Sequence, residues 1–152
     1  MILTSILLPN CVKVPLECKE KEGVITELID LLDSHGQLAD RDAALEAVLD
    51  REAIRSTGIG SSIAIPHAKC NVVKEIVMAI GIASGGIDFE SIDDEPVTIV
   101  ILLVSPLDQI GPHIQALARI SKLMLDEEFK KQLENASSSE QLYELLSSRE
   151  SE

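Results

Sequence analysis

The spacing of hydrophobic and polar positions changes along the chain and separates helical from extended segments. Residues 21–34 carry apolar side chains three and four positions apart, at Val24, Leu28, Leu31 and Leu32. This spacing predicts one buried helix face, and Gly36 follows as a stop signal. A second helix is predicted from Arg41 to about Ser56, with Asp40 placed to cap its N-terminus. Its apolar stripe consists of Ala44, Leu45, Val48 and Leu49.

Extended segments are predicted mainly in the middle of the chain. Residues 11–16 suit a short edge strand, and Ile63–Pro66 suits another short strand. Ile76–Ala83 is an apolar run with one glycine. Val97–Val104 is an almost unbroken run of β-branched residues and leucine, which is typical of a central strand covered on both faces.

Helices return after the last strand. Gly111-Pro112 should open a helix, because proline suits a first turn. We expect its apolar stripe at Ile114, Leu117, Ile120, Ser121 and Leu123–Leu125. Two shorter helices are predicted near 126–134 and 139–148. With helices at both ends and strands between them, the chain is predicted to form one layered α/β domain over residues 1–152, with helices on both sheet faces.

Composition narrows the classes of function. The chain has 152 residues and a formal net charge of −13, which argues against binding to nucleic acid or to anionic membranes. Cys11, Cys18 and Cys70 form no CxxC pair, so neither a zinc cluster nor a disulfide framework is indicated. The first residues lack a basic region and a cleavage site, and no apolar run reaches membrane-spanning length. A cytoplasmic protein is therefore expected.

The segment Thr57–Lys69 is the most informative part of the chain. A glycine-rich turn leads into the short apolar strand that we expect to stop at Pro66, because proline cannot donate to a sheet ladder. His67 would then stand just past the strand, at the rim of the sheet. Neutral imidazole is an available nucleophile near neutral pH. The alternative is a structural histidine at a strand end that bonds a backbone carbonyl.

Two further residues could join His67. His113 lies just inside the helix that follows the longest strand, where free N–H groups favour anions. If the strand ends at 66 and 104 are neighbours, both histidines face one pocket; otherwise His113 is an ordinary surface histidine. Arg51 precedes the glycine-rich turn, and its guanidinium would suit a phosphoryl group. A solvated arginine is the alternative, and Arg55 and Lys69 are expected to be peripheral cations.

Other sites are not indicated. The glycine-rich turn, Thr57–Ser62, matches neither GxxxxGK[ST] nor a GxGxxG that opens a helix, so neither ATP nor a dinucleotide is suggested. His35 lies at the end of a predicted helix, where a charge-favourable position explains it without a function.

These residues together resemble a known family. Arg51-Glu52, Ser56–Gly60, Ile63–Lys69 and Pro112–Ser121 are similar to segments of phosphotransferase-system enzyme IIA domains of the mannitol/fructose type. The likeness includes the spacing between the two histidines and covers nearly the whole chain. It implies a mixed β-sheet flanked by helices.

The resemblance also implies a phosphotransferase function. His67 would carry the phosphoryl group, His113 would orient or stabilise it, and Arg51 would supply positive charge. The donor would be the histidine-phosphorylated carrier HPr or its nitrogen-branch version, and the acceptor an enzyme IIB or a regulatory target. No metal, nucleotide or other cofactor would be needed, and nothing would insert into a membrane.

Three functions stay open from the sequence. The chain is predicted to be a nitrogen-regulatory or related signalling IIA protein, an interpretation favoured by its freestanding length. The alternative is a fructose/mannitol-type IIA protein in sugar transport that passes phosphate to enzyme IIB. The third is a binding module that has lost phosphotransfer.

Two finer expectations concern the surroundings of His67. A carbonyl or hydroxyl should bond one ring nitrogen and fix the tautomer, and the candidate hydroxyls belong to Thr57, Ser61 and Ser62. Three isoleucines could form part of a docking face for HPr, and these are Ile59, Ile63 and Ile65.

Overall fold

A mixed six-stranded sheet organises the chain, which the computed structural model describes over residues 1–151. Its strands are β1 (Leu7–Lys13), β2 (Gly58–Gly60), β3 (Ile63–Ala64), β4 (His67–Lys69), β5 (Val77–Ile87) and β6 (Val97–Ser105). The order is β1-β5-β6-β3-β2, and β4 also pairs with β6. The pairs β1·β5, β3·β6 and β4·β6 are parallel, whereas β5·β6 and β2·β3 are antiparallel. The mixed sheet is confirmed.

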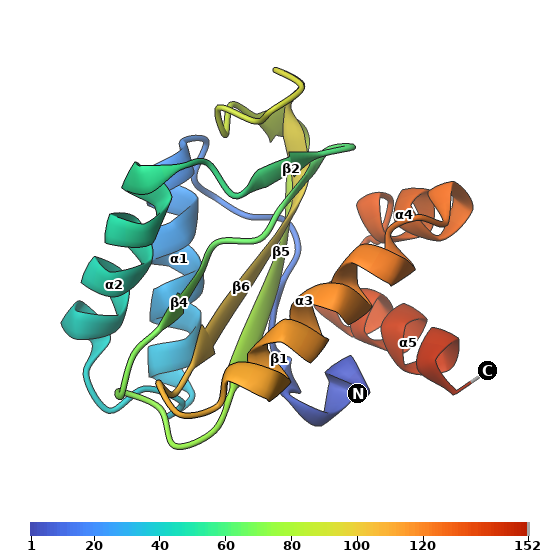
Figure 1. Cartoon of the computed structure of the whole chain (residues 1–152). Helices are drawn as coiled ribbons and strands as arrows, with labels where there is room; N and C mark the ends of the chain where they lie inside the picture. The colour runs from blue at the N-terminus through green and yellow to red at the C-terminus, as the bar shows by residue number, and fades with distance from the viewer. Residues whose placement is uncertain (152) are drawn as a thin grey trace.

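Helices cover both faces of this sheet. Figure 1 shows α1 (Lys21–Ser34) and α2 (Arg41–Ile54) on one side. The other side carries α3 (Ile110–Leu123), α4 (Glu127–Glu134) and α5 (Ser139–Glu150). A short 3₁₀ helix, η1 (Leu3–Ser5), precedes β1. The predicted layered α/β architecture is therefore confirmed. Within residues 1–151, no helix combines the length and apolar character needed to cross a bilayer.

The first two helices follow the predicted signals. Helix α1 has the expected bounds, and α2 ends two residues before the expected Ser56. The carboxylate of Asp40 accepts a hydrogen bond from the backbone N–H of Ala43 at 3.1 Å, as an N-cap should. Ala44 and Val48 are buried, and the neighbouring leucines of the stripe pack partly buried against the core. Both helices thus bury the face that their sequence periodicity indicates.

Strand β6 is the centre of the core. Eight of its nine residues are buried, which confirms a strand covered on both faces. It hydrogen-bonds to β5 on one side and to β3 and β4 on the other. The edge strand β1 also forms, although it begins at Leu7, four residues earlier than predicted.

The predicted apolar stripe of α3 is partly wrong. The helix buries His113, Ala116, Ile120 and Leu123, a spacing of three, four and three residues. Ile114 is 59% exposed, and Leu125, beyond the helix, is 80% exposed. Ser121 also faces solvent. The helix is rotated so that a histidine and an alanine occupy core positions, and neither residue type is a strong hydrophobic signal.

The expected stop of the short strand before His67 is confirmed, since β3 ends at Ala64, but the expected position of His67 outside any strand is wrong. Pairing lapses only at Ile65 and Pro66, and it resumes at His67, which lies opposite Leu103 of β6. Proline lacks an N–H but keeps its carbonyl, and the Pro66 oxygen accepts the N–H of Leu103 at 3.0 Å. His67 is therefore the first residue of a strand that the sheet holds, not a residue beyond a strand.

A buried carboxylate ties the chain ends to the helix that carries His113. Glu150 of α5 accepts the backbone N–H groups of Leu3 and Thr4 at 2.6 and 3.0 Å. It also accepts from Nε of Arg119 on α3 at 3.4 Å. Its side chain is only 2% exposed, so removal of the carboxylate would leave these donors without their acceptor.

Glu150→Ala should lower the free energy of unfolding by about 2 kcal/mol, because two backbone donors lose a charged acceptor. Glu150→Gln keeps one acceptor oxygen and should lose clearly less. Urea unfolding monitored by circular dichroism measures both. Equal losses in the two variants would contradict this role for the carboxylate.

Candidate active site

His67 is held by the sheet and by one hydrogen bond of its ring. Its Nδ1 lies 2.7 Å from the carbonyl oxygen of Ile65, two residues earlier. A carbonyl can only accept, so Nδ1 carries the proton and donates. Nε2 then keeps its lone pair. The expected carbonyl partner is thus present. The alternative interpretation of His67, a strand-end histidine that bonds a backbone carbonyl, describes the same hydrogen bond, but this bond uses one ring nitrogen and leaves the other available.

The three hydroxyls suggested for this role do not fill it. The hydroxyl of Thr57 donates to the carboxylate of Glu52 instead. Ser61 and Ser62 form the turn between β2 and β3, with positive φ values of 56° and 68°. The tautomer of His67 is set by the segment just before its strand, through a contact between residues two apart.

His113 lies against His67. The ring centroids are 5.4 Å apart and the ring planes are inclined by 58°. His113 occupies the first turn of α3 and is 3% exposed. Its Nδ1 lies 2.7 Å from Oγ of Ser105, the last residue of β6. The expectation that the two histidines share a pocket is confirmed, although 46 residues separate them in the chain.

Arg51 completes the cluster from the other helical layer. It lies in the last turn of α2, and its Nη1 donates to the carbonyl of Arg55 at 2.9 Å. Arg51, His67 and His113 line one hollow of about 480 Å³ together with Lys69, which we call the histidine hollow. A neighbouring hollow of about 300 Å³ is lined by Arg51, His67 and Arg55 among others. The three predicted residues therefore converge, with two further cations beside them.

Burial keeps both imidazoles neutral. The pKa of His67 is lowered by burial and by the nearby charge of Arg51, against the opposing pull of the Ile65 carbonyl. The pKa of His113 falls to about 4, mainly through burial, with smaller contributions from His67 and Lys69. At neutral pH the cluster thus holds two uncharged rings next to fixed cations, which suits nucleophilic attack on an anionic group.

Glu52 was not predicted from the sequence. Its carboxylate is buried, accepts the N–H of Thr57 at 2.8 Å, and pairs with Nζ of Lys21 at 2.9 Å. It therefore fixes the last turn of α2, including Arg51, against the start of β2. A signal exists in the sequence, because Glu52 continues the four-residue spacing of the buried Ala44 and Val48.

Of the three isoleucines predicted for a docking face, two are buried and one is exposed. Ile63 and Ile65 are buried, so their expected part in a docking face is wrong. Strand β3 and the residue after it point these side chains into the core. Ile59 is 47% exposed, and Ile92 and Ile114 are also exposed. These three line the two hollows around His67. An apolar rim therefore exists, but it is built largely from residues outside the predicted set.

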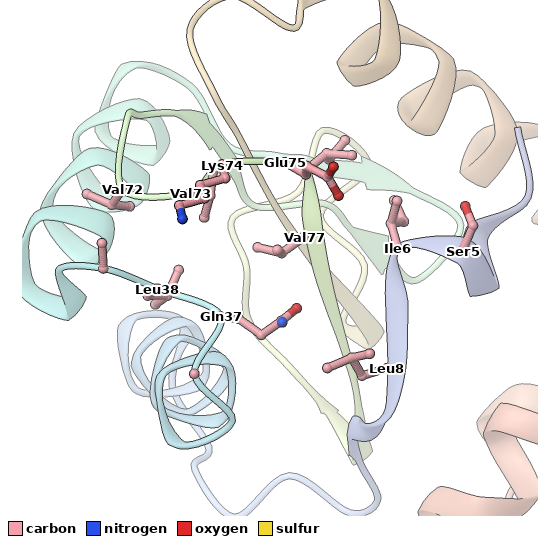
Figure 2. A pocket seen from close by; sticks show the side chains of 13 residues that line it. Ser5, Ile6, Leu8, Gln37, Leu38, Val72, Val73, Lys74, Glu75 and Val77 are labelled. Atoms are coloured by element: carbon pink, nitrogen blue, oxygen red, sulfur yellow. The ribbon is translucent and has the colours of Figure 1, made fainter.

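A further hollow lies away from the two histidines. It measures about 570 Å³ and is formed by the start of β1, the α1–α2 loop and the segment between β4 and β5 (Figure 2). Its charged residues are Lys74 and Glu75, and no histidine or cysteine lines it. Over residues 1–151, no three histidine, cysteine, aspartate or glutamate side chains gather as ligands for a metal ion. The histidine hollow is the site with evident chemistry.

Comparison with known proteins identifies the family of the chain. The family model described as "Phosphoenolpyruvate-dependent sugar phosphotransferase system, EIIA 2" matches residues 5–149. The chain therefore belongs to this family of EIIA phosphotransfer components.

Relatives of two kinds share the sequence. The chain is 40% identical over 146 residues to the PTS system fructose-specific EIIABC component of Bacillus subtilis, covering 96% of the chain but only 23% of that larger protein. It is 36% identical to the PTS system fructose-specific EIIA component of Haloferax volcanii, covering 83% of the chain and 82% of that protein. It is 32% identical to the nitrogen regulatory protein of Escherichia coli, covering 97% and 91%.

Solved structures share the fold. Nitrogen regulatory protein IIA-Ntr from Neisseria meningitidis superposes with a TM-score of 0.85 at 25% identity, covering 93% of this chain and 97% of that one. IIA mannitol from Escherichia coli, solved in complex with phosphorylated enzyme IIB mannitol, gives a TM-score of 0.79 at 24% identity, covering 93% and 96%.

The buried neutral state of His113 predicts a dependence of stability on pH. Its pKa is about 4 in the folded chain and about 6.5 when unfolded, so the unfolded chain binds the proton more readily between these values. The free energy of unfolding should therefore fall as pH drops from 6.5 to 4, by roughly 3 kcal/mol at most from this group.

His113→Gln removes this titration but leaves every carboxylate in place. Urea unfolding at a series of pH values should show a shallower loss for this variant than for the unsubstituted chain. Parallel losses across the range would contradict a buried, neutral His113.

Proposed function

We propose that this chain is a phosphohistidine carrier that accepts a phosphoryl group on Nε2 of His67 from an HPr-type protein and passes it on. The observation that carries the proposal is the hydrogen bond from Nδ1 of His67 to the carbonyl of Ile65. It leaves the lone pair of Nε2 available, in a hollow that Arg51 and His113 also line. In this sense the chain acts as a phosphotransferase.

The transfer step needs little covalent work by other side chains. The Nε2 lone pair attacks phosphorus, while the electron pair of the old P–N bond returns to the imidazole of the donor. The ring of His67 then gains positive charge, because Nδ1 keeps its proton. The carbonyl of Ile65 accepts from that N–H more strongly as the charge develops. Arg51, which lines the same hollow, supplies positive charge that offsets the negative charge of the phosphoryl oxygens.

The surroundings suit a protein partner that brings a phosphohistidine. The exposed side chains of Ile59, Ile92 and Ile114 form an apolar rim, and Arg51, Arg55 and Lys69 add positive charge. The isoleucines supply apolar contact area, and the cations attract the anionic phosphoryl group that the partner carries. We propose that HPr and the acceptor protein use this same rim in turn, since both must reach Nε2.

We propose a nitrogen-regulatory or related signalling role, in which phosphorylation of His67 controls binding to another protein. The alignment with the nitrogen regulatory protein of Escherichia coli and the fold agreement with IIA-Ntr support it. The second candidate is a sugar-uptake EIIA protein that passes phosphate to an enzyme IIB. The higher identity to two fructose-specific proteins favours this candidate. The convergence of Arg51, His67 and His113 argues against a module that has lost phosphotransfer.

The proposal treats residues 1–152 as one phosphotransfer domain that works in the cytoplasm. Among residues 1–151 all three cysteines are free, which suits a reducing compartment.

His67→Ala should abolish labelling of the chain by phosphorylated HPr, because the accepting nitrogen is gone. His113→Ala and Arg51→Ala should still be labelled, at rates lowered by about tenfold or more. Transfer of radioactive phosphate from phosphoenolpyruvate through the general phosphotransferase proteins measures this. His35→Ala, at an exposed histidine remote from the hollow, is the matched control. Label on the His67→Ala chain would refute the assignment.

The two candidate roles differ in what a fructose-type enzyme IIB does to the phosphorylated chain. In the regulatory role, the chain should keep its phosphoryl group in the presence of enzyme IIB. Phosphate-affinity gels of the mixture, sampled over minutes, follow the group. Rapid and complete transfer to enzyme IIB would favour sugar uptake instead, whereas labelling of His67 itself would be unaffected by either result.

A further inference from the structure

We propose that Ser105 is a positioning residue, which holds His113 in the tautomer with the proton on Nε2 so that His113 donates a hydrogen bond to the phosphoryl group on His67. The inference deepens the proposed function and rests on it. It assigns a part in phosphotransfer to the hydroxyl of the last residue of β6.

The first step is the rigidity of Ser105. It is fully buried, and its Oγ lies 2.7 Å from Nδ1 of His113. Ser105 is opposite Lys69 in the parallel pairing of β6 with β4, and its carbonyl accepts the N–H of Cys70 at 2.8 Å. The hydroxyl is thus fixed by the same pair of strands that fixes His67. Its hydrogen bond to Nδ1 therefore holds the ring of His113 on α3 in a fixed position relative to the sheet.

The second step is the direction of the hydrogen bond. A serine hydroxyl carries one proton, and its burial cost is offset only if that proton finds an acceptor. Within the described residues, the sole partner recorded for this hydroxyl is Nδ1 of His113. If Nδ1 donated to Oγ, the hydroxyl proton would have no acceptor in a dry site. The bond therefore runs from Oγ–H to Nδ1, and the His113 proton resides on Nε2.

The third step is that the two rings become complementary. His67 has its proton on Nδ1, facing Ile65, and a lone pair on Nε2. His113 has the opposite tautomer, with an N–H on Nε2 and its ring 5.4 Å from that of His67. One ring is then an acceptor of phosphorus and the other a donor of a hydrogen bond. A neutral His113 ring can donate this hydrogen bond from Nε2, so its burial, which disfavours the charged form, is compatible with the role.

The direct test reads the tautomers without any donor protein. In ¹⁵N-labelled protein at neutral pH, long-range ¹H–¹⁵N spectra distinguish a protonated from an unprotonated ring nitrogen. We expect His113 to show protonated Nε2 and unprotonated Nδ1, and His67 to show the reverse pattern. A His113 ring protonated on Nδ1 would overturn the proposal. This measurement requires no substitution, so it does not depend on the folding of a variant.

Variants then test the link to transfer. Ser105→Ala should leave His113 in a mixture of tautomers and lower the rate of phosphoryl acceptance about tenfold. The donor concentration at half-maximal rate should hardly change, because the docking rim is intact. Ser105→Thr keeps the hydroxyl and should restore most of the rate. Ser91→Ala is the matched control, since Ser91 is also buried but its Oγ has no hydrogen-bond partner among the described residues.

The outcomes separate this inference from the proposed function. A Ser105→Ala chain with an unchanged rate, or with a changed half-maximal donor concentration alone, would overturn the positioning role. A wild-type chain that takes no label on His67 would count against the proposed function, while the nitrogen spectra would still decide the tautomer of His113.

Discussion

The hydrogen bond between Nδ1 of His67 and the carbonyl of Ile65 is the interaction on which the site depends. It joins two residues of one short segment and so needs no distant partner to form. It determines which ring nitrogen has a lone pair, in a hollow that His113 and Arg51 also line. Without this bond, the half-buried imidazole of His67 could present either nitrogen, and the other groups of the hollow would have no fixed target.

The rest of the fold places side chains from both helical layers around the ring of His67. Strand β6 holds β4, and therefore His67, through pairing that continues past Pro66. Helix α2 brings Arg51 from one face of the sheet, and α3 brings His113 from the other (Figure 1). Glu52 and Ser105 are the buried polar groups that fasten these helices to neighbouring strands. A site with contributions from both layers explains why the chain uses a sheet covered on both sides.

Much of this arrangement could be predicted from the sequence, because its signals are local. The periodicity of residues 21–34 and the apolar run of β6 identify elements whose burial follows from side-chain type alone. The residues around His67 and those at the start of α3 were enough to predict that His67 and His113 belong to the functional site. The order of the strands could not be read in this way, since strand pairing joins residues far apart in the chain.

The errors share a physical cause, which is that burial is decided by tertiary contacts. His113 occupies a core position that its polarity does not announce, so the predicted stripe of α3 was rotated toward Ile114. Ile65 was expected near a docking face but is buried, and its carbonyl serves the site by accepting from His67. Proline at position 66 suggested the end of a strand, yet its carbonyl keeps the ladder with β6. Every residue has a backbone carbonyl, so the residue type does not reveal which carbonyls matter. In this site the carbonyls of Ile65 and Pro66 do.

The most direct test of the account is the position of the phosphoryl group on the ring of His67. Heteronuclear NMR of the ¹⁵N-labelled, phosphorylated chain detects coupling between phosphorus and the nitrogen to which it is bonded. The account predicts this coupling at Nε2 of His67, with the proton retained on Nδ1. A phosphoryl group bonded to Nδ1, or to any other residue, would contradict it.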